Sequence, residues 1–382
     1  METFFVGSNL RLARSFLGFT LEEVAEKVGK SKQFIHKLET NLDQPTDELL
    51  AALAENLNVH PQFFFYHNPI EIAEEQFHFR KLRTTKVGSK QKALAKGEIF
   101  KRLVDFLETK LDLPQYDFIE RSVASLEDIE AAAEALRSHF GLGSGPIQNI
   151  TRVAENAGAF VTTFQGISSE VDALSIAASR PVIVRNEVDR YACRLRFDIA
   201  HEIGHFVMHS GMLTGDRVTE SEANRFGGAF LLPRSSFVKE FPVSSSGRIS
   251  WKTLSEVKLR WKVSKAAMLM RARQLSLIDD RQLRGAIIKL KNESESRKES
   301  EDDSIEIEKP ILLDKAVRLV TRHYGMSLDD IALALGLKTS FIFEFLSQDT
   351  IEELTLPANV LRFPSIKNTN DFKGAFDQSA IV

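Results

Sequence analysis

Hydrophobic residues near the N-terminus recur three and four positions apart, which is the spacing of short amphipathic helices. Thr20 is a favourable N-cap for the run LEEVAEKV, and Glu23 stands at the third position of a capping box. Gly29 can adopt the left-handed conformation that ends this helix. Ser31 then caps a second run, KQFIHKLE, and a third run, TDELLAALAENLNV, follows. The pattern predicts a small helical domain over residues 1–67.

The pattern changes along the rest of the chain. Residues 68–118 continue as helix and are predicted to form a connector. Residues 119–292 combine helical periodicity with two short extended runs, AFVTTF and RPVIVRN, which predicts an α/β domain. Residues 293–309 are almost wholly polar and charged, as is typical of a flexible linker. Residues 310–382 hold a compact helical segment and a tail without clear pattern. We predict a multidomain, mainly α protein with a central α/β domain.

The connector carries a dense run of basic residues between positions 80 and 102, with Glu98 as the acid among them. These residues are Arg80, Lys81, Arg83, Lys86, Lys90, Lys92, Lys96, Lys101 and Arg102. Two interpretations stay open at this point. The run is either a solvated helix face or an electrostatic patch for phosphates.

Composition and charge narrow the classes of function. The 382 residues have a formal net charge of -3, so any contact with nucleic acid must use a local basic patch. Cys193 is the only cysteine, which excludes an internal disulfide and a cysteine-rich zinc site. Arg11 and Arg14 interrupt the apolar N-terminus before it could act as a signal core, and no apolar run is long enough to span a bilayer. We expect a cytoplasmic protein with no membrane contact.

The run His201-Glu202-Ile203-Gly204-His205 carries the clearest chemistry. On a helix, His201 and His205 project from one face one turn apart, so both imidazoles can bind one zinc ion. Glu202 lies beside the first histidine and is the candidate general base of a zincin mechanism. A chance match on a surface helix is the alternative. Apolar neighbours disfavour it: Phe197, Ile199, Phe206 and Val207.

A third metal ligand is expected from the helix that follows, ESEANRFGG. Glu220 is the preferred candidate, and Asn224, one turn further on, could hydrogen-bond to a ligand histidine. Glu222 competes, but it lies about 200° around the helix from Glu220. His209 also competes, since it extends the histidine stripe by one turn, although three successive turns diverge too far to converge well on one ion. We expect His209 to be a wall or structural residue.

The two N-terminal helices, 20–28 and 31–39, have the layout of a helix-turn-helix. Their predicted shared core consists of Val24, Ala25, Ile35 and Leu38. The exposed side of the second helix then carries the candidate DNA-contacting residues Lys32, Gln33, His36 and Lys37. A helical protein–protein module of the same fold is the alternative, because several glutamates offset the lysines. The C-terminal run SLDDIALALGLKTSFIFEFL superficially repeats this rhythm.

RLRFDIAHEIGHFVMH followed by ESEANRFGGAFLLP resembles the ImmA/IrrE metallopeptidase family, over roughly residues 125–290. The resemblance implies a zincin-like fold with His201, His205 and Glu220 as metal ligands and Glu202 as general base. It also implies zinc or manganese and a link to cleavage of transcriptional repressors. Arg194 and Arg196 match the family's R-x-R-F run, and they would either order the helix start or face the substrate. Phe226-Gly227-Gly228 stands where family members often have F-A-A, which predicts close packing or a local distortion there.

GFTLEEVAEKVGKSKQFIHKLETNLDQP resembles the Cro/C1-type (XRE) helix-turn-helix, over about residues 7–64. Asn41 stands where that family usually has glycine, and asparagine keeps the left-handed turn available. FHFRKLRTT resembles the segment that joins the two domains in fused proteins, so one architecture covers residues 7–345.

The sequence thus predicts a DNA-binding transcriptional regulator, expected to be a homodimer, with three hypotheses for its metal site. The site cleaves a partner repressor or its own chain, or it senses a metal and a peptide or small ligand without cleavage. Alternatively, the chain is the antitoxin or immunity component of a mobile-element pair. Zinc is the default metal for two histidines and one glutamate, with manganese or iron as alternatives.

Overall fold

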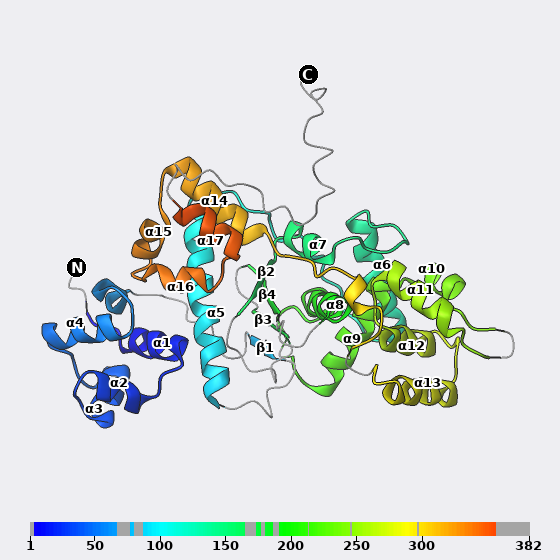
Figure 1. The fold of residues 1–382 in the computed structure, drawn as a ribbon, viewed down its shortest axis with the longest axis horizontal. Coiled ribbons are helices and arrows are strands. Elements are labelled where there is room, and N and C mark those ends of the chain that lie inside the picture. The colour runs from blue at the N-terminus through cyan, green and yellow to red at the C-terminus, as the bar shows by residue number, and fades with distance from the viewer. Residues whose placement is uncertain are drawn as a thin grey trace, which may run out of the picture.

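The computed structural model describes residues 4–66, 77–79, 87–164, 173–176, 180–185, 191–212, 214–244, 247–295 and 298–356. Figure 1 shows the N-terminal helices at one end of an elongated molecule, with a long helix beside them. A small sheet lies near the middle, and a helical body forms the other end. The two ends have separate hydrophobic cores. One core surrounds the N-terminal helices, and the other surrounds the helix that carries HEIGH.

The N-terminal domain folds as the capping residues predict. The elements are α1 (Gly7–Leu17), α2 (Leu21–Lys27), α3 (Lys32–Glu39), α4 (Asp47–Asn56) and the 3-10 helix η1 (Pro61–Phe65). The Thr20–Glu23 capping box is formed, and Gly29 has φ 62°. The four predicted core residues, Val24, Ala25, Ile35 and Leu38, are buried. Asn41 has φ 56° and accepts a hydrogen bond from the Gly7 amide, so it replaces the usual glycine without a break in the fold.

The C-terminal helices return to this domain and share its core (Figure 1). They are α14 (Leu312–Tyr324), α15 (Leu328–Ala334), α16 (Thr339–Phe343) and α17 (Gln348–Thr355), packed beside the long helix α5 (Val87–Glu108). The described part of the basic run lies on α5, and two of its cations are buried. Lys96 pairs with Glu344, and Arg102 binds Glu98 and the side chain of Asn9. These two residues are therefore not part of a phosphate-binding patch. The run from Arg80 to Lys86 lies outside the described residues.

The sheet has four short strands in the order β1-β3-β4-β2. They are β1 (Phe77–Phe79), β2 (Phe160–Thr163), β3 (Ala173–Ile176) and β4 (Val182–Arg185). β2 and β4 are parallel with Phe160 opposite Val182, whereas β1–β3 and β3–β4 are antiparallel. The two extended runs became β2 and β4, as predicted. The prediction of continuous helix after residue 67 was wrong at β1, because this three-residue strand depends on pairing with the distant β3.

Eight helices complete the described part of the central domain. They are α6 (Leu126–His139), α7 (Ile150–Asn156), α8 (Ala192–Met208), α9 (Arg217–Leu231), α10 (Arg234–Glu240), α11 (Trp251–Trp261), α12 (Lys265–Gln274) and α13 (Asp280–Asn292). Two glycines let α8 and α9 approach closely. A Cβ on Gly204 would lie 3.0 Å from the Phe226 ring, and one on Gly227 would lie 3.3 Å from the His201 amide nitrogen. The close packing expected at Phe226-Gly227-Gly228 is present at Gly227.

The acidic segment after α13 differs from the flexible linker that its composition predicts. Its described residues include the 3-10 helix η3 (Asp302–Ser304), and they pack on the central domain. Lys258 on α11 is fully buried, and its Nζ lies 2.7 Å from Glu299 and 2.6 Å from Asp302. A buried ammonium requires carboxylate partners, and this segment supplies them. Among the described helices, none has the length and apolar character to cross a membrane.

Candidate metal centre

α8 and α9 bring together three side chains that could hold a metal ion. His201 and His205 lie one turn apart on α8, are 1% and 3% exposed, and have their Nε2 atoms 3.1 Å apart. Glu220 comes from the first turn of α9, where the side chain of Asp216 caps the helix by accepting from the Val218 amide. Its carboxylate oxygens lie 3.4 Å from His201 Nε2 and 3.3 Å from His205 Nε2.

These spacings fit one tetrahedral ion. Zinc bonds to nitrogen and oxygen are about 2.0–2.1 Å long, so two tetrahedral ligands stand roughly 3.3 Å apart. The three donor–donor distances, 3.1, 3.4 and 3.3 Å, are close to this value. The residues present therefore fit a zinc ion, with one position left for water or substrate, as in catalytic sites.

Burial and neighbouring groups hold His205 and Glu220 in the protonation states that a metal would require. Burial lowers the pKa of His205 to about 4, so its ring is neutral near pH 7. Burial alone would raise the pKa of Glu220, but the adjacent rings of His201 and His205 outweigh it and lower the pKa to about 2. A neutral imidazole and an ionised carboxylate are the forms that bind metal.

The outer ring nitrogens of both histidines have partners that direct Nε2 toward the metal position. His201 Nδ1 lies 3.1 Å from Asn224 Oδ1, so it donates its proton there and keeps the lone pair on Nε2. His205 Nδ1 lies 2.9 Å from His209 Nδ1, and His209 Nε2 lies 2.9 Å from Glu222 Oε2. The consistent assignment is that His205 donates to His209, which donates to the Glu222 carboxylate.

This series of hydrogen bonds places the two competing ligand candidates, Glu222 and His209, behind His205. Glu222 and His209 bind each other behind His205, and Glu220 is the acid that faces both Nε2 atoms. The sequence placed Glu222 on another side of α9 but did not reveal its pairing with His209. That contact joins two helices across a loop, so no spacing rule within one helix could identify it. Glu202 is 2% exposed at the position after His201.

Arg194 and Arg196 lie in the first half of α8 and have different surroundings. Arg196 is buried and donates to the carbonyls of Ile147 and Lys262, and it pairs with Glu308. It therefore anchors the first half of α8. Arg194 is 45% exposed, pairs with Asp198, and lines a pocket beside the metal centre.

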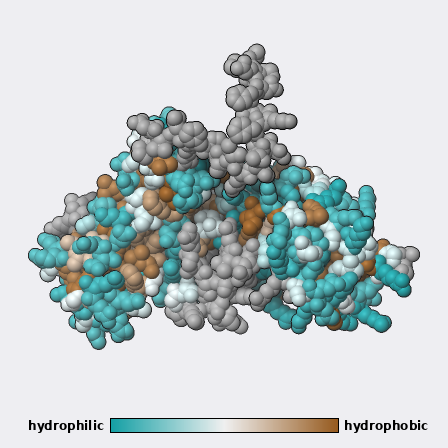
Figure 2. All heavy atoms as spheres, viewed as in Figure 1, coloured by the Kyte–Doolittle hydropathy of each residue, from teal (hydrophilic) through white to brown (hydrophobic). Residues whose placement is uncertain are grey.

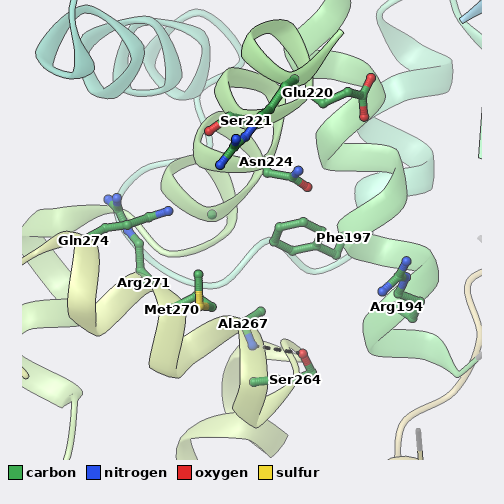
Figure 3. A pocket seen from close by; sticks show the side chains of 13 residues that line it. Arg194, Phe197, Glu220, Ser221, Asn224, Ser264, Ala267, Met270, Arg271 and Gln274 are labelled. Carbon is green, nitrogen blue, oxygen red and sulfur yellow. Dashed lines mark hydrogen bonds between the residues drawn. The ribbon is translucent and has the colours of Figure 1, made fainter. Parts of the chain in front are cut away.

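This pocket lies between α8, α9 and α12 and has a volume of about 590 Å³. Figure 3 shows Phe197 from α8 facing Met270 and Gln274 from α12, and Glu220 and Asn224 on α9. Its wall combines apolar side chains with polar and charged ones. The apolar side chains are Phe197, Ala266, Ala267 and Met270, and the charged ones are Arg194, Arg217, Glu220 and Arg271. A volume of this size is typical of a site for a small ligand or a side chain.

The candidate DNA-contacting residues lie together on one exposed face of α3. Lys32, Gln33, His36 and Lys37 are all exposed, whereas Ile35 and Leu38 on the opposite face are buried. Behind that face, Arg14 on α1 forms a buried ion pair with Glu39, at 2.6 Å and 3.0 Å. Figure 2 shows a largely hydrophilic surface at this corner of the molecule.

Comparisons with known proteins agree with both domains. Residues 10–64 match the sequence model of a helix-turn-helix family. Residues 150–273 match that of peptidase family M78, the IrrE N-terminal-like domain, which includes α8, α9 and α12. No curated protein matches the chain. The chain is thus a fusion of an XRE-type helix-turn-helix domain with an ImmA/IrrE-like metallopeptidase domain.

Proposed function

We propose that the protein is a cytoplasmic transcriptional regulator that binds DNA through α3 and hydrolyses a peptide bond in a partner repressor or in its own chain. The observation that carries the proposal is the set of three donors spaced for one tetrahedral ion, on a chain that also has a helix-turn-helix domain. Zinc is the proposed metal. The proposed reader of a symmetric DNA site is a homodimer.

Each residue of the site has its own role in the proposed hydrolysis. A metal held by His201, His205 and Glu220 would polarise the scissile carbonyl and acidify a water molecule. Glu202 accepts the proton of the attacking water and delivers it to the leaving nitrogen. Asn224 and His209 fix the imidazole rings, so that little reorganisation is needed during the reaction.

Replacing Glu222 with Gln is expected to weaken metal binding by about 10–100-fold, because His209 loses its anionic acceptor and orients His205 less firmly. The turnover of the metal-saturated enzyme should remain close to that of the wild type. Metal titration with a competing chelator measures the first quantity, and a peptide-cleavage assay at saturating metal measures the second. A variant with normal affinity would show that the His209–Glu222 contact does not support the ligand.

The pocket beside the metal centre is the proposed site for a large apolar side chain of the substrate next to the scissile bond. Its wall carries Phe197 and Met270, and Glu220 links it to the metal ligands. Gly228 forms part of the lining, and a Cβ there would lie 3.7 Å from Gln274 Oε1 and 3.8 Å from the Arg271 side chain. Alanine at this position therefore fits without strain and occupies pocket space.

Gly228→Ala is expected to lower kcat/KM at least about tenfold for peptides with a large apolar residue in the pocket, and much less for those with alanine there. The free energy of unfolding should be unchanged or higher by up to about 1 kcal/mol, because alanine is the better helix former. Gly227→Ala is the matched control, since its Cβ presses on the His201 backbone and should weaken metal binding instead. Equal losses for all peptides would contradict the pocket assignment.

For DNA, a Lys32→Ala/Gln33→Ala double variant is expected to weaken specific binding by about 10–100-fold, since a base contact and a phosphate contact are lost together. Both side chains are exposed, so the fold should keep its stability. Affinity measured at several salt concentrations should also show a smaller salt slope. An unchanged affinity and slope would favour the protein-interaction alternative.

A further inference from the structure

The C-terminal helices repeat the first three helices of the chain in order, in the turns between them and in the capping box of the second helix. α1 ends at Gly18 with φ 80°, and α14 ends at Gly325 with φ 65°. The next helix starts with a capping box in both copies, Thr20 with Glu23 in α2 and Ser327 with Asp330 in α15. The turns before α3 and α16 then contain Gly29 with φ 62° and Gly336 with φ 70°.

The core positions of the two copies also correspond. Val24 of α2 and Ile35 of α3 have no exposed surface, and neither do Ile331 of α15 and Ile342 of α16. The small residue at the helix crossing is Ala25 in one copy and Ala332 in the other, both buried. The helices of residues 312–346, which we name the second unit, therefore form another helix-turn-helix, outside the matched range 10–64. The helices α1 to η1, residues 7–65, are the first unit.

The second unit differs from the first at the four positions proposed to contact DNA. Lys32, Gln33, His36 and Lys37 correspond to Thr339, Ser340, Phe343 and Glu344. Two lysines are replaced by a neutral residue and an acid, so the helix lacks the charge that phosphates attract.

The second unit uses its turn and α16 to contact the first unit and α5. Phe341 stacks on Phe16 of α1 with ring centroids 4.3 Å apart, and Glu344 pairs with the buried Lys96 of α5. Ser340 accepts a hydrogen bond from the side chain of Asn58, although it occupies the position of Gln33. Positions that face solvent in the first unit therefore make protein contacts in the second.

The turn glycine explains how closely the two units approach. The Gly336 carbonyl accepts a hydrogen bond from the His60 amide at 2.8 Å, and Val59 pairs with Leu337 as an isolated β-bridge. A Cβ on Gly336 would lie 2.8 Å from the Phe63 Cα, so no other residue fits there without a shift of the backbone. The second unit thus covers part of Phe16 and of Phe63.

We propose that the second unit is a helix-turn-helix that does not bind DNA and serves as the resident protein partner of the first unit. The surface that corresponds to the DNA-contacting face of α3 covers one side of the first unit and of α5, and leaves the α3 face open. A second copy of the chain cannot use that covered side, so dimers must form elsewhere. Each chain then presents a single DNA-reading helix.

Cross-linking within the intact chain tests the docking without reference to DNA. Gln62 and Leu333 are both exposed, and the Gln62 side-chain amide lies 3.5 Å from the Leu333 carbonyl oxygen. In a Gln62→Cys/Leu333→Cys variant, a short bifunctional maleimide should give mainly an intrachain cross-link, because the native Cys193 is buried. The proposal would be overturned if the products mainly linked two chains. It would also be overturned if the double variant gave no more intrachain cross-link than the Gln62→Cys and Leu333→Cys single variants.

A charge reversal at the Lys96–Glu344 ion pair is a second test of the docking. Glu344→Lys should lower the intrachain cross-link yield at least severalfold, because the buried Lys96 then faces a like charge. A Lys96→Glu/Glu344→Lys double variant should restore it. Glu352→Lys makes the same charge change at an exposed position of α17 and should have no effect. An unchanged yield in Glu344→Lys would overturn the proposal.

DNA binding tests the assignment of roles. The probe is a duplex selected from a random pool with the wild-type chain. Lys338→Ala, in the second unit, should leave its affinity within twofold, whereas Lys32→Ala should lower it severalfold. The cross-linked chain should bind as well as the uncross-linked one. A tenfold loss in either the Lys338→Ala variant or the cross-linked chain would show that the second unit contacts DNA or must move to allow binding.

Discussion

Glu202→Gln is expected to reduce peptide hydrolysis by about 10²–10⁴-fold and to leave the metal content of the protein nearly unchanged. Glutamine keeps the size of the side chain but cannot accept the proton of the attacking water. The three ligand candidates are separate side chains, and their spacing does not depend on this residue. Elemental analysis and a cleavage assay on wild type and variant measure the two quantities side by side.

The same variant separates the hypotheses for the metal site. If hydrolysis drives regulation, transcriptional control should be lost together with cleavage. Glu222→Gln provides the comparison, because it should lower metal affinity while the saturated enzyme keeps its turnover. If the Glu202→Gln variant still regulates transcription, the protease hypothesis is wrong. That result would favour a sensor that acts through binding alone.

Features that depend on neighbours within one helix could be predicted from the sequence. The capping box at Thr20, the core positions Val24 and Ile35, and the His201–His205 stripe all follow from spacing of a few residues. The match of the two family models confirms the predicted fusion of domains. Local rules succeed here because helix geometry fixes which side chains share a face.

Features that join distant segments could not be predicted in the same way. Strand β1 exists through its pairing with β3, about a hundred residues later in the chain. The basic run on α5 looked like a solvated face or a phosphate patch, yet Lys96 is buried against Glu344 of the C-terminal helices. The sequence shows a charge but not its partner, and the partner decides whether the charge is buried.

The acidic segment after α13 shows the same limit for composition. A run of glutamates and serines is typical of a flexible chain, because it cannot bury apolar surface. Here the acids are instead counterions for the buried lysines Lys258 on α11 and Lys265 on α12. Glu299 also accepts hydrogen bonds from the backbone amides of Lys265 and Ala266, at the start of α12. The segment is ordered by charge pairing and helix capping, which composition alone does not reveal.

Lys258→Met is therefore expected to lower the free energy of unfolding by about 3–5 kcal/mol. Methionine keeps the length of the side chain but leaves Glu299, Glu301 and Asp302 without the ammonium that now lies 2.6–3.4 Å from them. Unpaired carboxylates in a buried position are costly, so the segment should detach and become accessible to proteases. Urea unfolding and limited proteolysis of the full chain measure both effects.

Lys298→Met is the matched control, since Lys298 belongs to the same segment but pairs with Asp303 at an exposed position. Its loss should lower the free energy of unfolding by less than about 1 kcal/mol. Similar stabilities for Lys258→Met and Lys298→Met would mean that burial of the acidic segment does not depend on the central lysine.

Acid should also lower the free energy of unfolding of the wild type, because it protonates Glu301. Burial opposes ionisation of Glu301, but hydrogen bonds from Ser255 and Lys265 outweigh it and lower its pKa to about 2 from 4.5. The carboxyl of Glu301 therefore binds its proton more tightly in the unfolded chain than in the folded one. Its contribution to the free energy of unfolding is present above pH 4.5 and is lost as the pH falls toward 2.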